Sequence, residues 1–86
     1  MDIYDYWVDN NGVGYRIQDM DNSYLQRCLA TVEKWKKTHR NYTVDDLDDE
    51  DLKEITKTGS KAWCVINAQK YIDAFETELA VREALE

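Results

Sequence analysis

The sequence predicts an α+β fold in which a small N-terminal β-hairpin precedes three helices, a ββααα order with helix in the majority. Asn11-Gly12, a strong hairpin turn signal, lies between two runs of alternating apolar residues. Apolar residues then recur at helical spacing from Leu25 onward. The chain also has no proline and only three glycines, which suits long helices with few loops. Its 86 residues are expected to form a single domain, 1–86.

The hairpin is expected over residues 3–18, with strands at 3–9 and 13–18. A two-residue type I′ turn at Asn11-Gly12 needs positive φ at both positions and sets the register. In that register Trp7 lies opposite Arg16, on the polar face of the ribbon. The apolar face then consists of Tyr4, Tyr6, Val8, Val13, Tyr15 and Ile17.

Three helices are expected, at 22–39, 44–57 and 61–84. Each begins after a residue that commonly caps a helix N-terminus, namely Asp21, Thr43 and Ser60, and Gly59 ends the second helix. The first and last helices carry apolar stripes, on Leu25, Cys28, Leu29, Val32 and Trp35 and on Val65, Ala68, Ile72, Phe75 and Leu79. Cys28 and Cys64 lie on apolar faces and are expected to be buried thiols.

The net charge of −7 is unevenly distributed along the chain. Residues 26–40 carry five bases and one acid, whereas residues 45–54 carry seven acids and one base. This acidic balance argues against direct nucleic-acid binding. It suits complementary contacts between subunits or with a protein partner. A chain this short also has a thin core, so we expect a homo-oligomer that buries more apolar area.

The acidic run has two open interpretations. Its carboxylates would imitate the phosphates of a nucleic acid and bind a protein partner, or they are simply acids favoured at the N-terminus of a helix. The candidate partner-binding residues are Asp45, Asp46, Asp48, Asp49 and Glu50. A calcium loop is excluded, because Glu50 stands where such a loop needs glycine.

A second candidate site lies around the hairpin and the start of the first helix. Trp7 would stack a base while Arg16 contacts a phosphate, and Tyr24 and Arg27, one helical turn apart, would extend a polar pocket. The alternatives are that a helix or a neighbouring subunit covers Trp7 and that Tyr24 belongs to the core. The basic end of the first helix, at 34–40, either receives an anionic group or is a solvated helix terminus.

No catalytic set emerges from the sequence. There is one histidine, no glycine-rich phosphate loop and no serine with an identifiable base. The ligands for a zinc site are too few. We therefore expect a protein that is not an enzyme and that uses no metal or cofactor. No segment resembles a signal peptide or a membrane span, so the expected location is cytoplasmic.

Residues 7–34 resemble a group of small, mostly uncharacterised phage-encoded proteins. Their pattern is a Trp, a Gly five residues later, alternating apolar residues, then Asp-Met, a capping residue and a helix. The matching positions are Trp7, Gly12, Ile17, Asp19, Met20, Ser23, Leu25, Leu29, Val32 and Glu33, with a weaker match in the last helix at Tyr71, Phe75, Glu78 and Arg82. Tyr24 and Arg27 replace the usual His and Asn, so a ligand that touches them would differ here. The acidic helix 44–57 also looks like an insertion peculiar to this chain.

The resemblance implies a role in host takeover or anti-defence in the cytoplasm of the host cell. In one mechanism, an oligomer sequesters a nucleotide immune signal, with bases on aromatic side chains and phosphates on Arg or Lys. In the alternative, an acidic protein inhibitor blocks a host defence protein, such as a nuclease or CRISPR effector, by imitating nucleic acid. A structural or regulatory phage protein with neither activity is the third possibility.

Overall fold

The computed structural model describes residues 3–9 and 11–85, and it has the ββααα order that the sequence predicts. The strands and the three α-helices are β1 (Tyr6–Val8), β2 (Gly14–Arg16), α1 (Asn22–Thr38), α2 (Asp49–Lys53) and α3 (Lys61–Ala84). Three short 3-10 helices accompany them, η1 (Ile3–Asp5), η2 (Ile17–Asp19) and η3 (Val44–Asp46).

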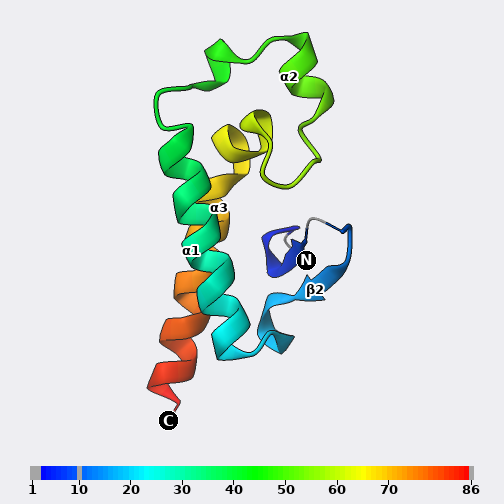
Figure 1. Ribbon diagram of the computed structural model, residues 1–86. Coiled ribbons are helices and arrows are strands. Elements are labelled where there is room, and N and C mark those ends of the chain that lie inside the picture. The colour runs from blue at the N-terminus through cyan, green and yellow to red at the C-terminus, as the bar shows by residue number, and fades with distance from the viewer. Residues whose placement is uncertain (1–2, 10, 86) are drawn as a thin grey trace.

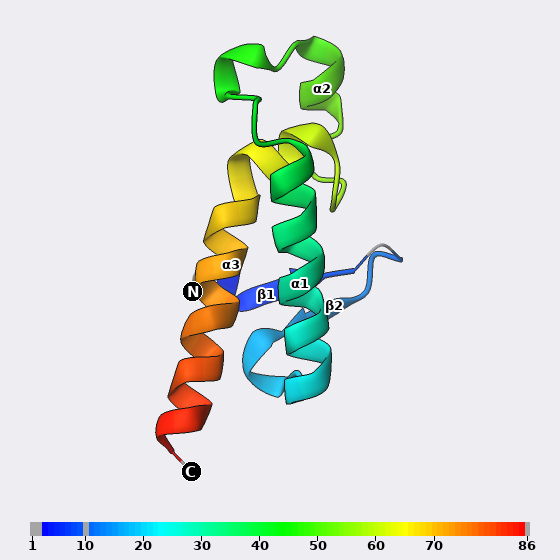
Figure 2. The same cartoon turned by 60° about the vertical axis from the view of Figure 1, so that its left-hand side comes forward.

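The long helices α1 and α3 lie side by side in both ribbon views and form the body of the molecule (Figures 1 and 2). The hairpin lies against the lower half of this pair, and its loop points away from the helices (Figure 1). The segment with η3 and α2 covers the opposite end. The molecule is elongated, with extents of 45 × 24 × 22 Å.

The N-cap expectations for α1 and α3 are confirmed. The side chain of Asp21 accepts a hydrogen bond from the Tyr24 backbone N–H at 2.8 Å, and the Ser60 hydroxyl accepts one from Trp63 N–H at 3.2 Å. These bonds satisfy backbone donors that would otherwise lack an intrahelical partner. Both helices therefore begin at the residues that the sequence indicates.

The predicted apolar stripes form most of the core between α1 and α3, but Val65 is half-buried and lies outside it. Leu25, Val32 and Phe75 are the largest side chains that are completely buried. The stripe positions Leu29, Trp35 and Leu79 are half-buried and pack against this core. Both cysteines are free and buried, as expected: Cys28 and Cys64.

The hairpin register differs from the prediction by one residue. Trp7 pairs with Tyr15, and Arg16 pairs with Tyr6. The loop is longer than a two-residue turn, because the Asp9 N–H bonds to the Val13 carbonyl at 3.0 Å. Of the two predicted turn positions, Gly12 has positive φ (80°) and Asn11 does not.

The side chain of Asp9 explains the longer loop. Its Oδ1 accepts hydrogen bonds from the backbone N–H groups of Asn11 and Val13, both at 2.9 Å. Such a local side-chain acceptor stabilises a turn that competes with the type I′ geometry. A shift of one residue between the strands moves the side chains of one strand, here β1, to the other face of the ribbon. Trp7 therefore points into the core, and Val8 is exposed.

The second predicted helix, 44–57, is much shorter in the structure. It divides into η3 and the five-residue α2, because two start signals follow one another. Asp46 accepts a hydrogen bond from Thr43 N–H at 2.7 Å, and then Asp48 and Asp51 cap each other's backbone N–H groups at 2.8 and 3.2 Å. Each capping box begins a new helical turn and ends the previous one.

Candidate functional site

A groove of about 890 Å³ runs between the hairpin and the C-terminal half of α3. A second depression, between α1 and α3, is smaller, at about 370 Å³. Pockets for small ligands occupy about 300–1,000 Å³, so this volume fits a ligand of that class. The side chains that matter most for its chemistry are Tyr4, Asp5, Tyr6, Arg16, Lys70, Asp73, Glu78 and Arg82.

Arg82 links the two walls of the groove, α3 and η2, through hydrogen bonds. From α3, its guanidinium donates to the carbonyl oxygens of Ile17 and Gln18, both at 3.1 Å, and to Oδ1 of Asn22 at 2.8 Å. Glu78, one turn earlier on α3, lies 3.9 Å away and pairs with the same group. Because the planar fork of Arg reaches several acceptors at once, this single side chain fixes η2 against α3.

Tyr4 makes a second link between the N-terminal segment and α3. Its hydroxyl donates to Oδ1 of Asn67 at 2.8 Å, and its ring meets the Tyr71 ring edge-on with centroids 5.2 Å apart. The ammonium of Lys70 lies 5.2 Å from the centre of the Tyr4 ring, a favourable cation–π distance. Tyr4, which contributes to the groove's aromatic character, is thus positioned by contacts with α3.

The groove presents both cations and carboxylates. Arg16 and Lys70 are exposed at its edges, and Tyr4 and Tyr6 between them are half-buried. Asp73 accepts a hydrogen bond from Gln69 at 2.8 Å. The site therefore combines groups that bind phosphate with acceptors that bind hydroxyl or amino groups.

Trp7, the first residue of the predicted ligand site, lies in the core and is only 3% exposed. Its indole meets the rings of Trp63, Tyr71 and Phe75 edge-on, with centroids 6.0, 5.5 and 5.4 Å apart. The expectation that Trp7 lies on the polar face opposite Arg16 is wrong, because the hairpin register is shifted. The alternative interpretation, that a helix covers Trp7, is confirmed.

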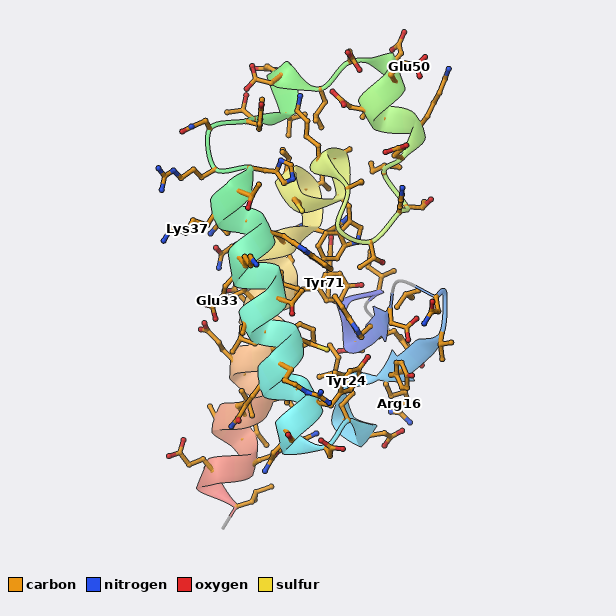
Figure 3. The ribbon with its side chains drawn as sticks, viewed as in Figure 1. Arg16, Tyr24, Glu33, Lys37, Glu50 and Tyr71 are labelled. Carbon is orange, nitrogen blue, oxygen red and sulfur yellow. The ribbon has the colours of Figure 1, made fainter. Side chains whose placement is uncertain are left out.

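The other three predicted ligand residues divide into two places. Arg16 lines the groove, whereas Tyr24 and Arg27 lie on α1 outside it, with the Arg27 guanidinium 5.9 Å from the centre of the Tyr24 ring. Tyr24 meets Tyr15 edge-on at 5.5 Å and reaches toward the hairpin, on the same side of the helices as Tyr71 (Figure 3).

Tyr24 also has a polar environment of its own. Burial and the neighbouring Cys28 thiol raise the pKa of Tyr24, and burial raises the pKa of Cys28. The buried indole N–H of Trp7 lies beside the Tyr24 hydroxyl but does not reach hydrogen-bonding geometry. Tyr24 is therefore half-buried. It packs against the hairpin at Tyr15 and does not line the groove.

The five predicted partner-binding acids are all exposed and lie on η3, on α2 and between them. Two of them also have structural roles, because Asp46 and Asp48 cap backbone N–H groups. Asp51, which the sequence did not single out, accepts the Asp48 N–H and lies 3.3 Å from the ammonium of Lys61. These contacts, the backbone hydrogen bond first, lower the pKa of the Asp51 carboxyl.

The described residues lack two other kinds of feature. No group of three or more His, Cys, Asp or Glu side chains in residues 3–9 and 11–85 is arranged to hold a metal ion. Within the same residues, no helix combines the length and the apolar character that a bilayer span requires.

The chain matches no known family model, and neither a curated protein nor a solved structure is significantly similar to it. The site therefore has to be interpreted from its own chemistry. Sequence reasoning missed Lys70 and Asp73 because nothing in their local pattern shows that α3 passes beside the hairpin. The sequence indicates Arg82 only as part of an expected resemblance, and its hydrogen bonds to η2 depend on the tertiary fold.

Proposed function

We propose that this chain is a non-enzymatic anti-defence protein of phage type that sequesters a nucleotide immune signal in the groove between the hairpin and α3. The observation that carries the proposal is the combination of two exposed cations, Arg16 and Lys70, with two half-buried tyrosines in one groove of about 890 Å³. A nucleotide offers phosphates to the cations and a base to the aromatic rings.

The carboxylates of the groove fit the same ligand. Carboxylates accept hydrogen bonds from ribose hydroxyls and from the exocyclic amino groups of bases. Asp5 and Asp73 line the groove beside the cations, so they are placed to make such contacts. They also disfavour inorganic phosphate alone, which has nothing to donate at neutral pH except its weakly acidic proton.

Native mass spectrometry of the protein purified from cells with a nucleotide-based defence system tests this proposal. We expect extra mass equal to a cyclic or ADP-ribose-type nucleotide. Arg16→Ala and Lys70→Ala should each lose that mass, whereas Lys34→Ala, an exposed lysine on α1 outside the groove, should retain it. Retention by both groove variants would refute the site.

The acidic inhibitor remains the second candidate, and one observation favours it. Val44 and Leu52 are 62% and 44% exposed among the carboxylates of η3 and α2, so the segment offers apolar as well as acidic contacts. Contact with a partner would remove this apolar area from water, which favours binding.

A variant that tests this candidate has to leave Asp46 and Asp48 unchanged, because both cap backbone N–H groups. Asp45→Asn, Asp49→Asn and Glu50→Gln together remove three charges while Asp46 and Asp48 keep their backbone hydrogen bonds. The inhibitor hypothesis expects this variant to lose inhibition of a host nuclease or CRISPR effector in vitro. Unchanged inhibition would exclude nucleic-acid mimicry by this segment.

A further inference from the structure

Unpaired charges of both signs gather at the end of the molecule that is distant from the C-terminus. Lys37 lies in the last turn of α1, Arg40 follows that helix, and Asp45 and Asp49 lie on η3 and α2. Within residues 3–9 and 11–85, none of these four side chains forms a hydrogen bond or an ion pair with another residue. Their neighbours are paired: Lys36 bonds to Gln69, Lys53 to Glu50, and Lys61 to Asp51.

The basic side chains border a hollow. Lys36, Lys37 and Arg40, together with the carboxylates of Glu33 and Glu76, line a depression of about 370 Å³ between α1 and α3. Figure 3 shows Glu33 and Lys37 on the side of α1 that faces away from the hairpin. The depression is therefore separate from the groove of the proposed ligand site, and no residue lines both.

Exposed apolar side chains lie between the basic and the acidic groups in the chain. Tyr42 is 44% exposed and Val44 is 62% exposed, directly before Asp45. The ammonium of Lys61 lies 4.1 Å from the centre of the Tyr42 ring and covers part of it. Leaving Val44 in water costs free energy that contact with another apolar surface would recover.

We propose that this end of the molecule, residues 36–50, is a self-complementary interface through which two copies of the chain form a two-fold symmetric dimer. In a two-fold dimer every contact occurs twice, with the roles of the two copies exchanged. The acidic side chains of one copy, Asp45 and Asp49, meet Lys37 and Arg40 of the other. Val44 lies near the symmetry axis.

A second copy fits this surface better than a uniformly charged partner does. A basic protein would satisfy the carboxylates and leave Lys37 and Arg40 against like charge, and an acidic partner would do the reverse. A second copy satisfies both sets at once. This surface also accounts for the self-association that the thin core of the chain leads us to expect.

The interface is expected to be weak and sensitive to salt. A stable complex buries about 800 Å² per partner. Because the exposed surface of this chain is 6025 Å² in total, an interface of that size would take a substantial share of it. Exposed charge pairs contribute little each and are screened when salt shortens the Debye length. Raising the salt concentration from about 0.1 M to about 1 M shortens that length from about 10 Å to about 3 Å.

Analytical ultracentrifugation of two charge-reversal variants tests the interface. Lys37→Glu with Arg40→Glu, and separately Asp45→Lys with Asp49→Lys, should each weaken the dimer about tenfold or more. An equal mixture of the two variants should restore it, because each contact in the mixed dimer again joins opposite charges. Far-UV circular dichroism of both variants confirms that they are folded.

Matched controls change the net charge by the same amount elsewhere. Arg27→Glu with Lys34→Glu, and Asp19→Lys with Glu83→Lys, alter exposed side chains outside residues 36–50 and should leave the dimer intact. A monomer at all concentrations at about 0.1 M salt, or a dimer that both reversal variants keep, would overturn the proposal. Ligand binding is measured separately, so its failure would not be confused with failure of the dimer.

Discussion

Replacing Trp7 by alanine should destabilise the whole domain. Trp7 is 3% exposed and contacts the rings of Trp63, Tyr71 and Phe75. Truncating a buried Trp or Phe to Ala costs about 3–5 kcal/mol, and each edge-to-face pair adds to the loss. A domain of this size has a free energy of unfolding of about 4–13 kcal/mol in total. We therefore expect Trp7→Ala to lose a large share of its stability.

Urea unfolding followed by far-UV circular dichroism measures this loss. Trp7→Phe is a matched variant, because the indole N–H has no hydrogen bond to lose and a phenyl ring keeps much of the edge-on contact. It should cost about 1–2 kcal/mol. Arg16→Ala, on the exposed face of β2, should stay within about 0.5 kcal/mol of the unmodified protein.

The result bears directly on the hairpin register. If Trp7→Ala lost less than about 1 kcal/mol, Trp7 would not be in the core, and the register with Trp7 opposite Tyr15 would be refuted. An exposed Trp7 would also restore the base-stacking role that the sequence suggests for it.

Three further predictions use other parts of the fold. Arg82→Lys should lower the urea midpoint of unfolding, because a lysine ammonium cannot reach the Ile17, Gln18 and Asn22 oxygens together. Arg82→Ala should lower the midpoint more. Equal midpoints for both variants and the unmodified protein would show that these hydrogen bonds of Arg82 do not stabilise the fold. Gly59→Ala should destabilise the chain by about 1 kcal/mol or more. Gly59 has φ of 90°, and the added Cβ of an alanine would lie 3.3 Å from the Trp35 ring. An unchanged melting temperature would argue against this conformation of Gly59. Burial raises the pKa of Cys64 from 9.0 to about 11, so the thiol stabilises the fold below pH 9. This contribution is lost between pH 9 and pH 11, because the unfolded chain releases its proton first. Cys64→Ala should therefore show a smaller decrease in the free energy of unfolding over this range, and an identical decrease would exclude the thiol as its cause.

The helices could be predicted because their signals are local. Asp21 and Ser60 cap α1 and α3 through backbone groups three residues away, and the apolar stripes need only the helical period. The hairpin register could not be predicted in the same way. Asn11-Gly12 favours a two-residue turn, but the Asp9 side chain stabilises the longer loop. The resulting shift turns over the β1 side chains, so that Trp7 rather than Val8 is buried.

The candidate site depends on contacts between residues that are distant in the sequence. Of the predicted ligand residues, only Arg16 lines the groove. Its partners there come from α3, more than fifty residues later, and no pattern around Lys70 or Asp73 distinguishes them from a solvated helix face. The acids of η3 and α2 could be found from composition, but their division into caps and unpaired carboxylates required the structure.

Titration of the isotope-labelled protein with a cyclic dinucleotide, followed by NMR of the backbone amides, tests the central claim most directly. The groove proposal expects the largest shift changes at residues that line it, such as Arg16, Gln18, Asp73 and Thr77, and no saturable change in the Arg16→Ala variant. Saturable changes confined to Tyr15, Tyr24 and Arg27, or the absence of any change with both a cyclic dinucleotide and ADP-ribose, would contradict it.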